Sequence, residues 1–274
     1  MLQKVLFTFA IFFVLTNLSI AQSDFFVKLD NKNRVREAGT LANAEKEGLW
    51  LSFKRNGKHK KRYYVNGKKQ RLSKVSIEKR YDIEKNENSF GLLTNGKKEG
   101  IWFTFNENDL ISSIAHYKAG ILEGKYYRFH ADGEVLGLDM YVNGKKHGIC
   151  KEFHSGGALH YSTEYVHGKI RDGENVYYHP NGNIKFLDYY KDGLKFGKST
   201  SYYKSGAIEI EGTYRDKGLA EGPWKEYYEN GKLKEKYYYK HGLFHGEYTI
   251  YDQAGNITAQ YIYKNDKLIK TIVE

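Results

Sequence analysis

The side chains of this sequence that could do chemistry are histidines, one cysteine and acidic residues. Four histidines each stand directly before a glycine: His147, His167, His241 and His245. They are spread along the chain and recur in register, which is typical of a repeat consensus. His154 and His160 flank one turn and could approach each other within a hairpin, but a structural zinc site needs more than two protein ligands. We therefore expect no metal site and no cofactor.

Cys150 is the single cysteine of the chain, so no internal disulfide can form. It occupies a slot that aromatic residues fill elsewhere, and a small apolar filler is the simplest interpretation. Glu123, Asp172 and Glu221 each precede a glycine in the same register. The sequence contains no phosphate-binding loop, no nucleophile elbow and no Ser/His/Asp set that can be placed together. We therefore predict no catalytic residues and no enzyme activity.

These residues are positioned by an internal repeat, which is the main feature of the sequence. Each unit opens on a glycine: Gly48, Gly100, Gly124, Gly148, Gly173, Gly197, Gly222 and Gly246. From Gly100 onward the spacing is 24 or 25 residues. Five positions after each opening glycine stands an aromatic residue: Phe53, Phe105, Phe129, Phe153, Tyr178, Tyr202, Tyr227 and Tyr251. About ten units fit between residue 24 and the end of the chain, with an irregular stretch near residues 66–90.

Each unit has the pattern of a β-hairpin. Asn-Gly pairs suit tight turns with positive φ, as at 66–67, 95–96, 143–144, 181–182 and 230–231. Short runs of Tyr, Phe, Val and Ile between the turns favour strands. Within the second strand the aliphatic and the tyrosine, such as Leu233 and Tyr239, are an even number apart, which predicts that they share a face. The predicted fold is all-β: an elongated, twisted antiparallel sheet of stacked hairpins.

Residues 1–21 have the pattern of a secretory signal peptide. Lys4 supplies the charged start, an apolar run follows, and a small-residue cleavage site precedes Gln22. An uncleaved membrane anchor is the alternative. We expect residues 22–274 to form one repeat domain, and a secreted chain without disulfides suits a bacterial envelope, in the periplasm or outside the cell.

The charge of the chain is strongly positive, at +11, and many lysines lie at turns. Turn lysines keep a long sheet soluble and protect its edges. The alternative is a basic rim that attracts an acidic protein, anionic lipid or acidic glycan. The candidate binding surface consists of Trp50, Trp102, Trp224, Lys145 and Lys146. Nucleic acid is an unexpected partner because of the export signal.

The repeat resembles a known family in two segments, residues 143–148 (NGKKHG) and residues 222–233 (GPWKEYYENGKL). They are similar to the bacterial variant of the MORN repeat, found in proteins labelled as the YwqK-type antitoxin family, and the similarity extends over about residues 24–268. The resemblance implies an elongated antiparallel sheet that mediates protein contacts, with membrane-lipid binding also proposed for related proteins. It implies no catalytic residues.

Three functions are compatible with these patterns. The first is a non-enzymatic exported scaffold that acts by protein–protein contact, for which an extended repeat surface is suited. The second is an envelope module that binds glycan or phospholipid, which requires exposed tryptophans. The third is an antitoxin or immunity protein, which predicts a neighbouring toxin gene.

Overall fold

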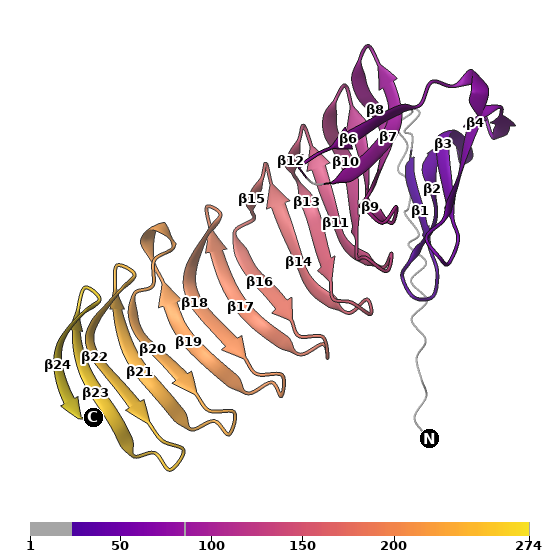
Figure 1. The fold of residues 1–274 in the computed structure, drawn as a ribbon. Coiled ribbons are helices and arrows are strands. Elements are labelled where there is room, and N and C mark those ends of the chain that lie inside the picture. Colours follow the sequence, from indigo (N-terminus) through magenta and orange to yellow (C-terminus); the bar gives the residue numbers. More distant parts are fainter. Residues whose placement is uncertain (1–23, 85, 274) are drawn as a thin grey trace, which may run out of the picture.

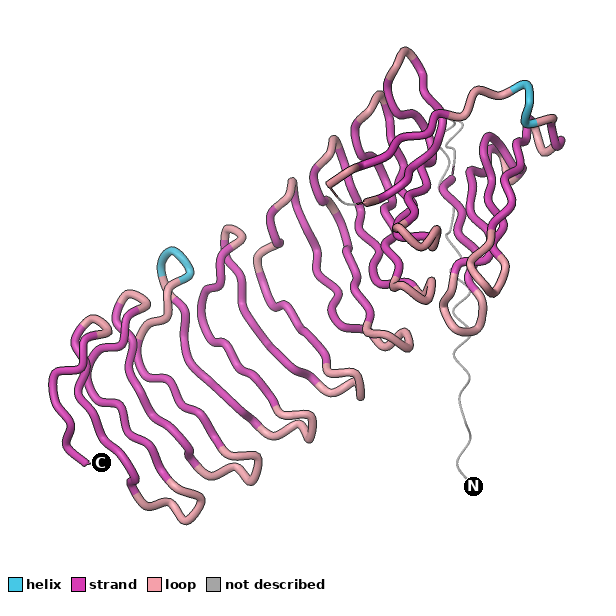
Figure 2. The backbone as a smooth tube through the Cα atoms, viewed as in Figure 1, coloured by secondary structure: helices cyan, strands magenta, loops and turns pink. Residues whose placement is uncertain are grey.

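The computed structural model describes residues 24–84 and 86–273, and these fold almost entirely into antiparallel strands (Figures 1 and 2). The predicted signal peptide lies outside the described residues. Two short 3-10 turns, η1 (Leu72–Lys74) and η2 (Asp216–Gly218), are the helical elements of this part of the chain. No helix within it is both long enough and apolar enough to cross a membrane. The all-β prediction is confirmed.

The first sheet has five strands in chain order. They are β1 (Asp24–Leu29), β2 (Val35–Ala42), β3 (Glu45–Phe53), β4 (His59–Val65) and β5 (Lys68–Gln70). η1 follows at once, so the sheet ends within the stretch where the sequence repeat is irregular. Figure 1 shows this sheet standing against the N-terminal end of a much longer one.

The second sheet contains the remaining strands. They are β6 (Glu78–Asp82), β7 (Glu87–Thr94), β8 (Lys97–Phe105), β9 (Ile111–Lys118), β10 (Ile121–Phe129), β11 (Val135–Val142), β12 (Lys145–Lys146), β13 (Gly148–Phe153), β14 (Leu159–Val166), β15 (Lys169–Ile170), β16 (Gly173–Tyr178), β17 (Ile184–Lys191), β18 (Leu194–Tyr202), β19 (Ile208–Tyr214), β20 (Gly222–Tyr227), β21 (Leu233–Lys240), β22 (Leu243–Tyr251), β23 (Ile257–Lys264) and β24 (Lys267–Val273). Strands β11 and β14 each pair with the two strands that follow them. Among the described residues β6 pairs with β7 alone and β24 with β23 alone, so the sheet is open, elongated and twisted.

Two kinds of turn alternate along this sheet. At Asn143-Gly144 both residues have positive φ, 50° and 74°, which gives the tight two-residue hairpin expected from the sequence. At Asn181-Gly182 and Asn230-Gly231 only the glycine has positive φ. There the strand register shifts beside the turn, as between Glu226 and Tyr227, which is typical of a turn followed by a glycine bulge. The expectation that these Asn-Gly pairs all close the same kind of tight turn is therefore wrong.

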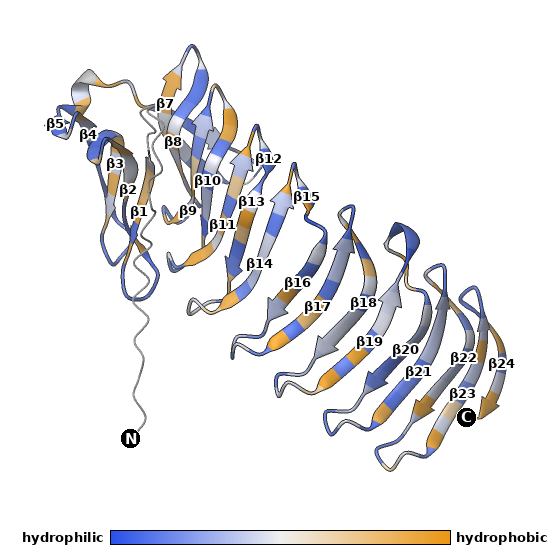
Figure 3. Ribbon diagram, turned by 180° about the vertical axis from the view of Figure 1, so that it is seen from behind, coloured by the Kyte–Doolittle hydropathy of each residue, from blue (hydrophilic) through white to orange (hydrophobic). Residues whose placement is uncertain are grey.

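The bulge also overturns the expected facing of the aliphatic and tyrosine residues. Leu233 pairs with Tyr227, whereas Tyr239 pairs with Gly222. Directly paired residues point to the same side of a sheet, and Tyr227 and Gly222 are an odd number of residues apart. Leu233 and Tyr239 therefore lie on opposite faces. Figure 3 shows the aliphatic strand starts as orange segments beside the lower turns of β17, β19 and β21.

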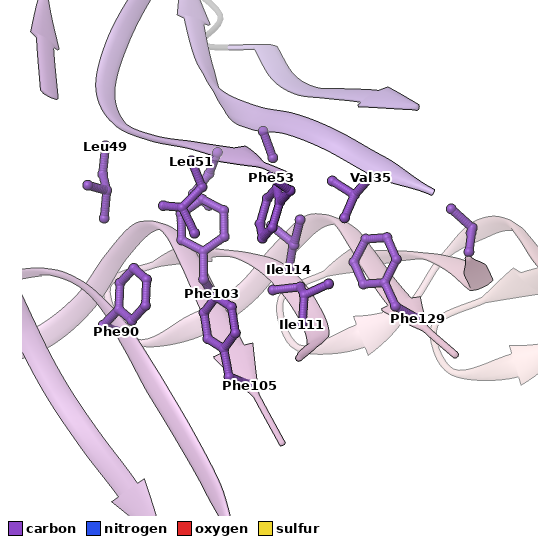
Figure 4. Packing of buried hydrophobic residues seen from close by; sticks show 13 residues of the cluster. Val35, Leu49, Leu51, Phe53, Phe90, Phe103, Phe105, Ile111, Ile114 and Phe129 are labelled. Atoms are coloured by element: carbon purple, nitrogen blue, oxygen red, sulfur yellow. The ribbon is translucent and has the colours of Figure 1, made fainter. Parts of the chain in front are cut away.

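The main hydrophobic core lies between the two sheets (Figure 4). Leu51 and Phe53 of β3 face Phe103 of β8 and Ile114 of β9, and all four side chains are buried. We call this side of the second sheet the sandwich face. Residues in the same register continue this face along the sheet, such as Tyr127 and Leu138, which pair directly. We call the opposite side the tyrosine face.

The first sheet covers only the first strands of the sandwich face. Its turn at Asn33 reaches the second sheet, where Val135 N donates to Asn33 O at 3.1 Å. A Cβ on Gly157 would lie 2.2 Å from the Asn33 amide nitrogen. Beyond this turn the described strands continue as a single layer, as Figure 1 shows for β16–β24. The fold is thus a sandwich at one end and an open sheet at the other.

Candidate interaction surface

The tyrosine face is built from pairs of a unit-opening glycine and a tyrosine. Gly100 pairs with Tyr117, and Gly222 pairs with Tyr239. The same pairing recurs in every unit from β8 to β23: Gly124–Tyr141, Gly148–Tyr165, Gly173–Tyr190, Gly197–Tyr214 and Gly246–Tyr263. All seven of these glycines have positive φ, and a Cβ on Gly100 or Gly222 would have nothing within 4 Å. Glycine is therefore required at these positions for its backbone conformation, and the regular spacing of glycine and tyrosine reflects the geometry of the sheet.

The three candidate tryptophans are buried, which corrects their assignment to an exposed surface. Trp50 and Trp102 are each 1% exposed and Trp224 is 8% exposed. Trp102 Nε1 donates to Leu92 O at 3.1 Å, and Trp50 Nε1 donates to Thr40 O at 3.0 Å. These side chains pack against the surface of the sheet and are shielded from solvent. They therefore cannot provide an aromatic platform for a glycan.

Each tryptophan lies over a glycine of the preceding strand. A Cβ on Gly39 would lie 2.1 Å from the Trp50 ring, and one on Gly212 would lie 2.0 Å from the Trp224 ring. The corresponding distance from Gly91 to Trp102 is 2.6 Å. These glycines are outside the repeat register and stand eleven or twelve residues before a tryptophan. That spacing is the signal which sequence reasoning missed.

The two candidate lysines have different environments. Lys146 is half-buried on the tyrosine face, where its Nζ lies 2.8 Å from Asp139 Oδ1 and 5.2 Å from the Tyr165 ring centroid. Lys145 is exposed and pairs with Val142. The structure therefore assigns Lys146 a packing role and leaves Lys145 on the surface.

Lys146 belongs to a charge cluster at the start of the open sheet. Asp139 is buried and also accepts from Arg128 Nε at 3.1 Å, while Arg128 Nη2 donates to Glu152 at 3.1 Å. Burial opposes ionisation of Glu152, but the hydrogen bonds from Arg128 and His160 outweigh it and hold the Glu152 pKa below its usual value. The acidic and basic groups satisfy one another, so the cluster tethers neighbouring strands.

The histidine and cysteine side chains are also used for packing. The rings of His154 and His160 lie 4.5 Å apart, so the hairpin does bring them together. His160 Nδ1, however, lies 3.3 Å from Glu152 Oε1. Within the described part of the chain, no group of three or more His, Cys, Asp or Glu side chains could hold a metal ion. Cys150 Sγ accepts from Met140 N at 3.4 Å, and burial raises the pKa of the Cys150 thiol, which keeps it protonated.

A ladder of side-chain hydrogen bonds joins successive units at the bulged turns. His154 Nε2 lies 2.8 Å from Tyr178 O, and His179 Nε2 lies 2.7 Å from Tyr202 O. Tyr203 Oη donates to the Tyr227 carbonyl at 2.7 Å in the next unit. His130 and Tyr228 make the same contact with Phe153 and Tyr251. A histidine or tyrosine six positions after the opening glycine is the sequence signal for this ladder.

A second ladder joins the units at the tight turns. The carboxylate before an opening glycine accepts from a backbone amide of a turn in the unit that the glycine opens, about twenty residues on. Glu123 accepts from Asn143 N at 2.8 Å, Asp172 from Asp192 N at 2.8 Å, and Glu221 from His241 N at 2.7 Å. The recurrence of acidic residues in register thus reflects hydrogen bonding to turns.

We expect Glu221→Ala to lower the free energy of unfolding by about 1 kcal/mol, because it leaves the His241 amide without its charged acceptor. Hydrogen exchange should accelerate at His241. Glu229→Ala is the matched control, since Glu229 is exposed on a neighbouring turn. Equal losses for the two variants would contradict a role of Glu221 in holding the turn.

The open part of the sandwich face carries shallow pockets. One of about 360 Å³ lies beside Pro223, Tyr238 and His245. Another of about 350 Å³ lies beside Ile149, Glu164 and Arg171 and is more polar. Tyr238 and Ile149 are exposed. These side chains lie on the side opposite the tyrosine face, where the first sheet does not cover the second.

Four segments match the family model described as the MORN repeat variant: residues 171–192, 197–216, 220–241 and 244–265. Four segments of the chain are therefore MORN-type repeats. They correspond to consecutive hairpins from β16 to β23, and the glycine–tyrosine pairing of these hairpins is also found from β8 onward.

No curated protein matches the chain. Among solved structures, similarity is found to "Crystal Structure of TcdB2-TccC3-Cdc42", with 8% identity, 87% of this chain and 16% of that chain covered, and a TM-score of 0.18. A second is "Structure of Photorhabdus luminescens Tc holotoxin pore, Mutation TccC3-D651A", with 11% identity, 87% and 17% coverage, and a TM-score of 0.16. The chain spans about one sixth of the length of these two chains.

Proposed function

We propose that this protein is a non-catalytic MORN-type scaffold that binds a partner protein along the open part of its second sheet. The observation that supports this is the single-layered stretch β16–β24, which carries exposed apolar side chains such as Tyr189, Tyr238 and Leu243. Exposed apolar groups along an extended surface are a mark of protein interaction sites. Repeat arrays provide such surfaces because each unit contacts only its neighbours.

Burial of Trp50, Trp102 and Trp224 removes the basis for a glycan or phospholipid site built on them. The signal-peptide pattern of residues 1–21 supports export to a bacterial envelope as part of the proposal. Recovery from envelope fractions of a chain that begins at Gln22 tests the export. A full-length chain found only in the cytosol would contradict it.

Site-specific photo-crosslinking in the native cell tests the binding function. A benzophenone amino acid at Tyr189 or at Tyr238 should yield the same discrete protein adduct, because both side chains lie on the open sandwich face. The matched control places the probe at Ile83, which is more exposed but lies near the irregular junction. Absence of protein adducts from both open-face positions, or equal adducts from Ile83, would contradict the proposal.

A further inference from the structure

One edge of the second sheet carries a row of aliphatic–lysine pairs. At four tight turns, from β9–β10 to β17–β18, a lysine pairs directly with an aliphatic residue: Lys118 with Ile121, Lys145 with Val142, Lys169 with Val166, and Lys191 with Leu194. We call these eight residues the turn row. The aliphatic members are unusually open to solvent, at 51% for Ile121, 39% for Val142, 42% for Val166 and 50% for Leu194. All four lysines are also exposed.

The turn row is continuous along the sheet because successive turns touch. A Cβ on Gly144 would lie 3.3 Å from Ile121 Cγ2 of the preceding hairpin. A Cβ on Gly193 would lie 3.3 Å from Lys169 Cβ in the same manner. The aliphatic and basic groups thus form one unbroken line.

The positive charge of the row is not neutralised within the fold. Asp192, directly after Lys191, is the one carboxylate within these four turns. The carboxylates of Glu123 and Asp172, which reach the turns from neighbouring strands, are hydrogen-bonded to turn amides. Lys146 and Lys195, on the tyrosine face, are the lysines that pair with buried aspartates, each at 2.8 Å. Within residues 24–84 and 86–273, no ion pair involves any lysine of the turn row. Lys191 Nζ lies 5.2 Å from the Phe196 ring centroid, which leaves its charge without a carboxylate. An acidic partner would therefore meet four lysines that make no ion pair among the described residues.

The spacing of the row matches an α-helix. Two strands at about 4.8 Å each give about 9.6 Å per hairpin, and a heptad of α-helix rises about 10.5 Å. Over the three steps from Ile121 to Leu194 the two repeats differ by only about 3 Å by the same spacings. A helix with one aliphatic side chain and flanking carboxylates in each heptad can thus meet every aliphatic–lysine pair. A bilayer needs a plane of contacts, whereas the row is a single line on a twisted sheet.

We propose that the turn row docks an acidic amphipathic α-helix of the partner protein. This rests on the proposed scaffold function and names the partner's chemistry. Aliphatic side chains of the helix pack on Ile121, Val142, Val166 and Leu194. Its carboxylates pair with the lysines between them.

A synthetic helical peptide of four heptads, with one leucine stripe flanked by glutamates, is the test probe. It should bind the full chain, and Lys145→Glu with Lys169→Glu should weaken binding by about tenfold or more. The matched control is Lys58→Glu with Lys204→Glu, which makes the same change in charge at exposed positions in turns outside the turn row and should leave the affinity unchanged. Val142→Ser with Val166→Ser should also weaken binding.

Several outcomes would overturn the proposal. They are equal loss in the two charge-reversed variants, equal binding of a peptide with lysines in place of the glutamates, or binding only to vesicles of phosphatidylglycerol and phosphatidylcholine. If the peptide fails while Tyr189 and Tyr238 still crosslink to a protein, the scaffold function stands and the helix site falls. If crosslinking fails as well, both fall.

Discussion

Phe103→Ala is expected to lower the free energy of unfolding by about 4 kcal/mol, because Phe103 is fully buried where the two sheets meet. The loss should be confined to one end of the molecule. Hydrogen exchange should accelerate over both the first sheet and β7–β11, while β19–β23 keep their protection. Repeat arrays transmit instability mainly between neighbouring units, and strands β16–β24 contribute no residue to this core.

Phe244→Ala is the reciprocal control. Phe244 stacks on Tyr239 at 4.6 Å and on Tyr248 at 5.7 Å between ring centroids, so its loss should loosen β21–β23 and leave the sandwich protected. Uniform loss of protection along the chain in either variant would show that the whole molecule unfolds as one unit.

Gly212→Ala is expected to cost about 3 kcal/mol, because the new methyl group overlaps the Trp224 ring. Trp224→Ala should cost about 3–5 kcal/mol by removing a buried aromatic side chain. In the double variant the overlap is gone, so Gly212→Ala should add little to the cost of Trp224→Ala. Denaturant melts of the four proteins measure this coupling.

If the two costs were additive in the double variant, glycine would be required at residue 212 for its backbone conformation. Room for the Trp224 ring would then not be the reason. Gly222→Ala is a useful comparison, since Gly222 has a φ of 79° and nothing within 4 Å of its Cβ position. Its cost should be independent of the residue at position 224.

The repeat and its hairpins could be predicted because they depend on local chemistry. Asn143-Gly144 closes the expected turn, and the opening glycines and their tyrosines recur in every unit. The bulged turns could not be predicted from the odd or even spacing of residues. A bulge takes one residue out of register and so moves Leu233 to the opposite face of the sheet. Counting residues alone does not show which turn contains it.

The sandwich was missed because it depends on contacts between distant units. A signal was present, however: Leu49–Leu51 and Ile101–Phe103 are runs of consecutive apolar residues, which indicate strands covered on both faces. The later units carry at least one charged residue at these positions, such as Lys125, Glu174 or Lys198. The candidate tryptophans failed for a related reason, since residue type alone does not distinguish a binding platform from a ring packed over Gly212.

The ladder of carboxylates at the tight turns has a consequence for how such a chain can change in length during evolution. Glu123 and Glu221 each bind an amide about twenty residues downstream, and the histidine and tyrosine ladder spans about the same interval. Donor and acceptor therefore recur with the period of the repeat. Duplication or deletion of one whole unit would restore both ladders across the new junction, whereas a change of a few residues would break them. The fold thus favours growth and loss in whole hairpins, with the sandwich remaining as a fixed end.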